Sequence, residues 1–164
     1  VETSIIELDS VFNSFESKLE NFNSELAYAN SRSRLRMVTL YQVAQSINGL
    51  VVGTGNKVED FGVGFYTKYG DGGVDISPIA DCTKSDVWDM AEKLGIIKDI
   101  VQADPTDGLW DDNRNDENQL GLSYKQIEEA MINKNSEHYK KYYKIREPNL
   151  HKMKPIPVCV FPKK

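Results

Sequence analysis

The sequence contains little cysteine and no long apolar run. Its two cysteines, Cys82 and Cys159, lie far apart, which indicates a reducing compartment rather than a disulfide scaffold. They also lack the spacing of a zinc site. No apolar run approaches the roughly 20 residues that cross a bilayer, and Val1 does not open a signal peptide with basic and apolar regions. We therefore expect a cytoplasmic protein with no membrane partner.

An excess of positive charge is also absent. Lysine and arginine total 20 against 25 for aspartate and glutamate, and the formal net charge is -5 at pH 7. Such a chain has no general attraction to nucleic acid, so we expect none as a partner, and an anionic ligand must be held by local cations. The two histidines stand in unrelated contexts, and no serine, cysteine or histidine constellation indicates a covalent nucleophile.

The length of 164 residues suits one domain with a hydrophobic core, because it is too short for two domains of ordinary size. Apolar content and alternation predict strands at 3–8, 50–52 and 74–79. Helical spacing predicts helices at 9–20, 37–47 and 83–94, and further helices that start at Ser123 and Ser136. Residues 104–118 are acidic and lack periodicity, which predicts a long loop of the kind that often forms a lid.

Capping signals mark two of these helix starts. Thr83 followed by Asp86, and Ser123 followed by Gln126, have the spacing of a capping box. Gly95 is placed to end the helix that Thr83 begins. Because these signals are local, they predict the two helix boundaries without reference to the rest of the fold.

The most informative segment runs from Gly53 to Lys84. Its first part, Gly53-Thr54-Gly55-Asn56, follows the apolar residues 50–52, which we interpret as a buried parallel strand. Glycines at the carboxyl end of such a strand let backbone amides approach phosphate groups. Glu59 lies a few residues further on, within reach of a Mg²⁺ ion, although an isolated glutamate of this kind would be interpreted as an exposed residue.

The second part of the segment contains Lys68-Tyr69-Gly70-Asp71-Gly72-Gly73 and then Asp75. Its glycines can take a positive φ, so both carboxylates can be aimed from a rigid turn at ribose hydroxyls or an amide. A solvated hairpin tip is the alternative for such a motif in isolation. Lys84 opens a predicted helix, where the helix dipole and free backbone amides favour an anion such as phosphate.

Together these motifs closely resemble the second half of the ammonia-dependent NAD synthetases, members of the ATP pyrophosphatase superfamily. The resemblance is dense at 30–37, 53–59 and 67–73 and reaches His151-Lys152. It implies an α/β fold, a Rossmann-like parallel sheet with flanking helices. The phosphate-binding loop of that family, Ser-Gly-Gly-x-Asp-Ser, does not occur in the sequence. We therefore expect residues 1–164 to be the carboxyl-terminal portion of a single domain, with an incomplete sheet that lacks its first two strands.

The resemblance also implies a reaction. Family members amidate deamido-NAD with ammonia and ATP, through an acyl adenylate, to give NAD, AMP and pyrophosphate, with Mg²⁺ as cofactor and a homodimer as the assembly. Because the centre of the sheet is missing, we expect this chain alone to be inactive. Two alternatives remain open: a non-catalytic dimerisation module derived from the same family, and the carboxyl-terminal part of a glutamine-dependent NAD synthetase.

The family motifs assign roles to eleven residues of this sequence. Glu59 is the implied metal ligand, and Asp71 and Lys84 are the implied catalytic residues. The implied ATP-binding residues are Arg34, Thr54, Lys84 and Thr106. The implied deamido-NAD-binding residues are Arg36, Lys68, Asp71, Asp75, His151 and Lys152. Arg34 and Arg36 lie two apart on a helix and face different ways, so only one is expected to touch ligand. Thr106 fits an ordinary loop threonine nearly as well, and His151 in isolation would be interpreted as a surface residue.

Overall fold

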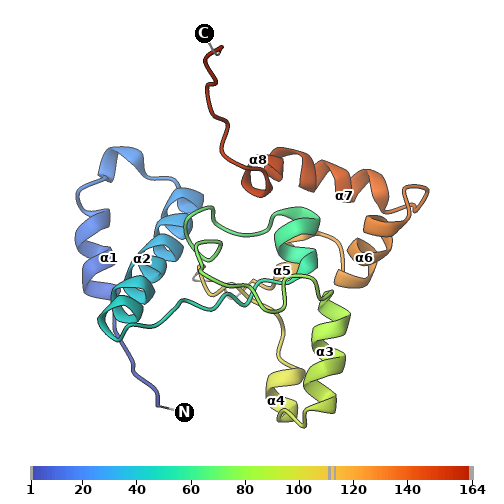
Figure 1. Ribbon diagram of the computed structural model, residues 1–164, viewed down its shortest axis with the longest axis horizontal. Helices are drawn as coiled ribbons and strands as arrows, with labels where there is room; N and C mark the ends of the chain where they lie inside the picture. Colours follow the sequence, from blue (N-terminus) through green and yellow to red (C-terminus); the bar gives the residue numbers. More distant parts are fainter. Residues whose placement is uncertain (1, 111, 113, 163–164) are drawn as a thin grey trace. The chain divides into compact units, whose positions relative to one another are not determined.

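A computed structural model describes residues 2–110, 112 and 114–162, and this part of the chain is mainly helical (Figure 1). The chain divides into two compact units. The first unit comprises Val1–Gly55, Tyr66–Pro78 and Asp104–Asp116, and the second comprises Asn56–Phe65, Ile79–Ala103 and Glu117–Lys164. Within the described residues, no helix combines the length and the apolar character that a membrane crossing requires.

The helices follow one another along the chain in both units. They are α1 (Asp9–Glu16), the 3₁₀ turn η1 (Glu20–Phe22), α2 (Glu25–Ser46), the π-helix η2 (Lys57–Val63), α3 (Lys84–Lys93), α4 (Lys98–Val101), α5 (Asp116–Leu120), α6 (Tyr124–Ile132), α7 (Tyr139–Arg146), the 3₁₀ turn η3 (Glu147–Asn149) and α8 (Leu150–Met153). The predicted helix at 37–47 is therefore the second half of α2, which begins twelve residues earlier at Glu25, after the N-cap Ser24.

The expected Rossmann-like parallel sheet is not formed, and that prediction of the fold class is wrong. In the described residues, backbone pairing between extended segments is limited to an isolated parallel bridge between Val52 and Ile76. The Gly53 amide donates to the Ile76 carbonyl at 2.7 Å, and the Asp75 amide donates to the Val51 carbonyl at 2.9 Å. The predicted strands at 50–52 and 74–79 thus meet, but over too short a length to count as strands.

The predicted strand at 3–8 pairs with no other strand among the described residues. Ile5 is 88% exposed and Ile6 is 51% exposed, so this segment buries neither of its two isoleucines well. A strand is stable only where adjacent strands satisfy its backbone groups and cover one of its faces. Because the described chain supplies no central strands, the sheet that the family resemblance implied has nothing to assemble around.

The capping predictions are confirmed. Thr83 and Asp86 form a capping box at the start of α3, and Ser123 and Gln126 form one at the start of α6. Gly95 follows α3 with a φ of +70°, the left-handed conformation that favours glycine at a helix end.

The second unit has the better-developed core. Its buried cluster consists of Val58, Val63, Leu120, Leu122, Tyr124, Ile127, Ala130 and Tyr142. This cluster packs η2 against α6 and α7, which lie side by side in Figure 1. The first unit, in contrast, leaves many apolar side chains of α2 exposed, among them Leu26, Val38, Leu40 and Val43. The segment that contains Glu59, η2, is therefore anchored in the core of the second unit through Val58 and Val63.

Candidate functional site

Glu59 lies in the first turn of the π-helix η2. Asn56 caps its start, because its side-chain Oδ1 accepts from the amides of Val58 (3.0 Å) and Glu59 (3.1 Å). The Lys57 amide donates to the Cys82 carbonyl at 2.8 Å. A π-turn is rare and is often found at functional sites. The loop after Gly53 thus leads into a short helix whose first turn is held by the Asn56 cap and by the bond from Lys57 to Cys82.

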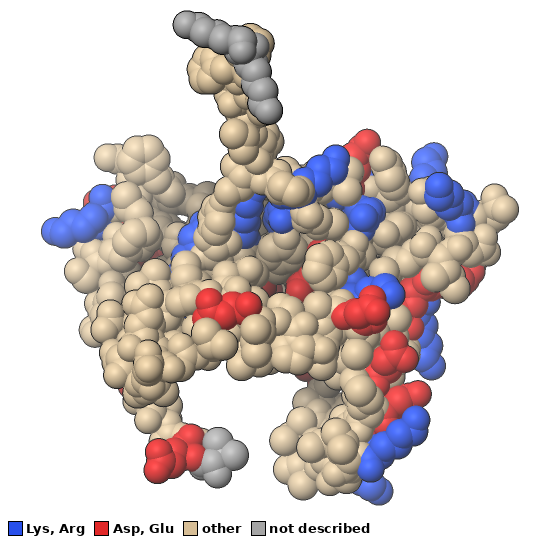
Figure 2. All heavy atoms as spheres, in the orientation of Figure 1, with Lys and Arg blue, Asp and Glu red and all other residues tan. Residues whose placement is uncertain are grey.

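Side chains of α7 and of the turn η3 bind the carboxyl-terminal end of η2. Arg146, on the basic helix α7 (Figure 2), donates to the carbonyls of Phe61 and Gly62. Asn149 Nδ2 donates to the Val63 carbonyl at 3.1 Å. These carbonyls have few partners within the helix itself, so the side chains satisfy the end of η2 as a capping group would. Glu59 is therefore carried by an element that is fixed at both ends.

Lys152 and His151, both predicted to bind deamido-NAD, also engage backbone carbonyls. Lys152 Nζ donates to the Gly64 carbonyl at 2.8 Å, directly after η2. The ring Nδ1 of His151 lies 2.9 Å from the Pro148 carbonyl. The structure therefore places Lys152 near the Glu59 segment and leaves His151 exposed on the short helix α8.

Glu59, Lys84 and Tyr124 form a compact cluster in the second unit. Glu59 Oε1 accepts from Lys84 Nζ at 3.0 Å and from the Tyr124 hydroxyl at 2.7 Å. The side chains of Glu59 and Lys84 are each only 17% exposed. Lys84 Nζ also lies 4.8 Å from the centre of the Tyr124 ring, within the range of a cation–π interaction. The structure thus brings together the predicted metal ligand and a predicted phosphate-binding lysine.

Tyr124 was missed in the sequence, where only Ser123 was recognised as a helix start. Nothing in the pattern distinguishes it from an ordinary core residue at the first turn of a helix. It is completely buried, and its ring packs edge to face against Trp88 with 5.9 Å between ring centres. Its contacts with Glu59 and Lys84 form only when α6 packs against η2 and α3.

The start of α3 is already occupied by side chains of the protein. The Asp86 amide donates to Thr83 Oγ1 at 3.1 Å, and the Ser85 amide donates to Glu128 Oε1 at 2.9 Å. Hydrogen bonds from the Thr83 hydroxyl and amide lower the pKa of Asp86. The amides of Ser85 and Asp86 are therefore not free for phosphate, and what α3 offers to an anion is the ammonium group of Lys84.

Thr83→Ala is expected to destabilise the protein by about 1 kcal/mol, because it removes the hydroxyl that caps α3. Asp86 has a lowered pKa in the folded state, so its contribution is present at neutral pH and is lost as the pH falls below the ordinary value of 3.8. The difference in the free energy of unfolding between the variant and the wild type should therefore become smaller in acid. Urea unfolding followed by circular dichroism at several pH values measures it. Thr39→Ala, inside α2, is the control and should not be destabilising.

In the first unit, Asp71 supports the glycine turn. Its Oδ1 accepts from the Ser33 hydroxyl at 2.7 Å and from the Thr67 amide at 2.9 Å, and its own amide donates to Ser33 Oγ at 3.0 Å. Thr67 in turn donates its hydroxyl to Asn30 Oδ1 at 2.6 Å. Asp71 thus joins the turn to α2, and only its Oδ2 lies outside these bonds.

Asp75 is held just as firmly. Its Oδ2 accepts from the Val51 amide at 2.8 Å and its Oδ1 accepts from the Tyr41 hydroxyl at 3.1 Å. Burial, and then the hydrogen bond and charge of Asp75, raise the pKa of Tyr41. Asp75 therefore links the 74–76 segment both to α2 and to residue 51.

Glycine at position 53 is required by packing. A Cβ there would lie 2.8 Å from Val74 Cγ2, closer than real Cβ atoms tolerate, and 3.1 Å from Ser77 Oγ, a tight contact. Gly53 thus permits the short pairing with the 74–77 segment, and Thr54, the predicted ATP-binding residue, is exposed directly after it.

Arg34 and Arg36 contact different segments, as their spacing on α2 predicts. Arg34 Nε donates to the Lys68 carbonyl at 3.3 Å, and the Lys68 ammonium lies 5.5 Å from the centre of the Tyr69 ring. Arg36 donates to the carbonyl of Gly108 at 2.8 Å, and the Gly108 amide donates to Thr106 Oγ1 at 3.2 Å. The structure therefore connects Arg36 with the Thr106 loop.

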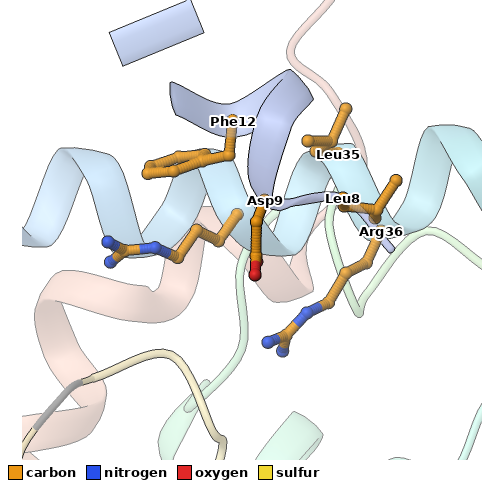
Figure 3. Close-up of a pocket in the computed structure, with 6 residues that line it drawn as sticks. Leu8, Asp9, Phe12, Leu35 and Arg36 are labelled. Atoms are coloured by element: carbon orange, nitrogen blue, oxygen red, sulfur yellow. The ribbon is translucent and has the colours of Figure 1, made fainter. Parts of the chain in front are cut away.

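A small pocket of about 90 Å³ lies between α1 and α2. It is lined by Leu8, Asp9, Phe12, Arg32, Leu35 and Arg36. Figure 3 shows the carboxylate of Asp9 and the guanidinium of Arg36 directed to the same side of α2. The pocket is thus walled by apolar side chains and carries both charge signs at its edge.

The backbone resembles solved structures of nicotinamide nucleotide synthetases. The structure of NMN synthetase from Francisella tularensis matches with a TM-score of 0.90 and 29% identity, over 98% of this chain and 68% of that one. The NH3-dependent NAD synthetase from Campylobacter jejuni matches with a TM-score of 0.75 and 23% identity, over 98% and 66%. The first match adds sequence similarity to the likeness of fold, whereas the second concerns the fold alone.

A family profile described as NAD synthase matches residues 1–155, and the chain belongs to that family. It is 41% identical over 132 residues to the NH(3)-dependent NAD(+) synthetase of Carboxydothermus hydrogenoformans, covering 78% of this chain and 54% of the relative. It is 37% identical over 165 residues to that of Archaeoglobus fulgidus, covering 97% and 66%. The resemblance seen in the sequence is confirmed, and the chain spans about half to two thirds of the length of these curated relatives.

Proposed function

We propose that residues 1–164 are the carboxyl-terminal portion of an NAD synthetase domain, and that the whole protein amidates deamido-NAD with ammonia in a reaction that consumes ATP. The observation that carries this proposal is the pairing of Glu59 with Lys84 in a chain of the NAD synthase family. A carboxylate and a lysine at this distance offer a metal ligand and a phosphate-binding cation side by side.

Glu59 fits a Mg²⁺ ion that is shared with a nucleotide. Its Oε1 accepts from Lys84 and Tyr124, whereas its Oε2 accepts from neither. No group of three or more histidine, cysteine or acidic side chains suited to a metal occurs in the part of the chain that the structure describes. Mg²⁺ bound through one carboxylate takes its other ligands from phosphate and water. When bound there, the ion would neutralise phosphate charge as pyrophosphate departs.

Lys84 would exchange one anionic partner for another. Without nucleotide its ammonium group neutralises Glu59, and with nucleotide it would donate to a phosphate oxygen nearby. The same unit carries Lys152 and His151, for which we propose contacts with deamido-NAD. This arrangement stabilises charge by position and requires no covalent intermediate on the protein.

The first unit supplies the remaining proposed contacts. We propose ATP contacts for Arg34, Thr54 and Thr106, and deamido-NAD contacts for Arg36, Lys68, Asp71 and Asp75. Asp71 can accept a proton or a hydrogen bond only through Oδ2, because Oδ1 holds the turn. The exposed apolar side chains of α2 also support the homodimer that the family resemblance implies.

The assay for this function is NAD formed from deamido-NAD, ATP and ammonium. We expect no turnover by the 164 residues alone, because the described chain lacks the central strands and the sequence lacks the phosphate-binding loop. Turnover at an ordinary enzymatic rate would contradict this. The similarity to NMN synthetase from Francisella tularensis favours a mononucleotide as a second candidate substrate, so nicotinate mononucleotide belongs in the same assay.

A further inference from the structure

We propose that Tyr124 is a positioning residue of the metal and phosphate site, which fixes Glu59 through its hydroxyl and Lys84 through its ring. The inference rests on the proposed function and adds to it a residue that touches neither metal nor phosphate. Its basis is that a single buried side chain contacts both candidate site residues.

The hydroxyl orients the carboxylate. A buried tyrosine hydroxyl needs a hydrogen-bond partner, and the 2.7 Å bond to Glu59 Oε1 has the length of a bond to a charged acceptor. Lys84 binds the same oxygen at 3.0 Å. Two donors on Oε1 fix the rotation of the carboxylate, so that Oε2 is the oxygen presented to a metal ion.

The ring cannot move aside, because α6 and its neighbours hold it. The Tyr124 amide donates to Glu117 Oε1 at 2.9 Å, and the capping box at Ser123 sets the start of the helix. Trp88 of α3 packs against the ring edge to face. Lys84 Nζ, 4.8 Å from the ring centre, is attracted to its face. Tyr124 therefore ties α3, which carries the lysine, to η2, which carries the glutamate.

The direct test is Tyr124→Phe, which keeps the ring and removes only the hydroxyl. Hydrogen-bond partners of metal ligands typically contribute ten- to a hundredfold to metal affinity. We expect the half-saturating Mg²⁺ concentration for ATP binding to rise roughly tenfold, while ATP binding in excess EDTA stays unchanged because Lys84 remains. Tyr143→Phe, at an exposed position of α7, makes the same chemical change away from the cluster and should leave both values as in the wild type.

Glu59→Gln separates failure of this inference from failure of the proposed function. If Glu59→Gln abolishes the Mg²⁺ dependence but Tyr124→Phe keeps the wild-type half-saturation, the role of Tyr124 is overturned and the metal site stands. If Glu59→Gln keeps the wild-type Mg²⁺ dependence, the metal site itself is wrong. A loss of stability in Tyr124→Phe without a change in Mg²⁺ dependence shows a purely structural residue and also overturns the inference.

A measurement on the wild-type chain covers the case in which Tyr124→Phe does not fold. With ¹³C in the tyrosine ζ position, the Tyr124 signal should shift when Mg²⁺ and ATP are added together, while the Tyr143 signal should stay in place. A stationary Tyr124 signal at saturating Mg²⁺ and ATP would overturn the inference.

Discussion

Glu59→Gln is expected to abolish the Mg²⁺-dependent part of ATP binding by this chain, a loss of about ten- to a hundredfold at saturating Mg²⁺. Glutamine keeps the size of the side chain and an oxygen that can accept from Tyr124, so the change removes charge rather than shape. In the wild type the Lys84 ammonium is held 3.0 Å from Glu59. ATP binding without Mg²⁺ should therefore not weaken in the variant, because Lys84 loses its competing partner.

Calorimetric titration with ATP, in Mg²⁺ and then in EDTA, measures both parts of this prediction. Glu92→Gln is the matched control, because this substitution removes the same charge from an exposed position on α3. Equal Mg²⁺ enhancement in the wild type and in Glu59→Gln would contradict the assignment of Glu59 as a metal ligand.

Gly70→Ala is expected to destabilise the protein by about 3 kcal/mol. A Cβ at position 70 would lie 2.2 Å from Ser33 Oγ and 2.8 Å from Thr67 Cβ. Ser33 cannot turn away without losing its two hydrogen bonds with Asp71. The methyl group therefore either strains the turn or separates it from α2, and each outcome breaks bonds that hold the 67–73 segment.

The midpoint and slope of urea unfolding report this effect, with Gly49→Ala as the control. A Cβ at Gly49 would meet its nearest neighbour, Ile47 Cγ1, at 3.4 Å, an ordinary contact, so we expect a change within about 0.5 kcal/mol. If the two alanine variants unfolded at the same urea concentration, the close packing of Gly70 against Ser33 would not limit stability, contrary to this prediction.

The features predicted correctly from the sequence are those that depend on neighbouring residues. The capping boxes at Thr83 and Ser123 use a donor and an acceptor three residues apart, so the sequence alone contains the whole interaction. That the segment from Gly53 to Lys84 contains residues of one site stays a prediction. The structure shows that Glu59 and Lys84, twenty-five residues apart, are in contact.

What the sequence could not predict depends on distant partners. The segments 3–8 and 50–52 have the composition of strands, but a strand forms only beside another strand, and the described residues supply a bridge at Val52 alone. The sequence gives no local signal that one oxygen of Asp71 accepts from Ser33, thirty-eight residues away, while the contact of Asp71 with a substrate stays a prediction. Tyr124 has no local signal, because its function arises from contacts across sixty-five residues of sequence.

We propose that η2 and the start of α3 form a metal and phosphate site in this member of the NAD synthase family. Amide NMR spectra of the chain, recorded as ATP is added with and without Mg²⁺, test it most directly. We expect Mg²⁺-dependent shifts concentrated at residues 57–60, 84 and 124, with smaller changes elsewhere in the second unit. Shifts that are identical with and without Mg²⁺, or that avoid these residues, would contradict it.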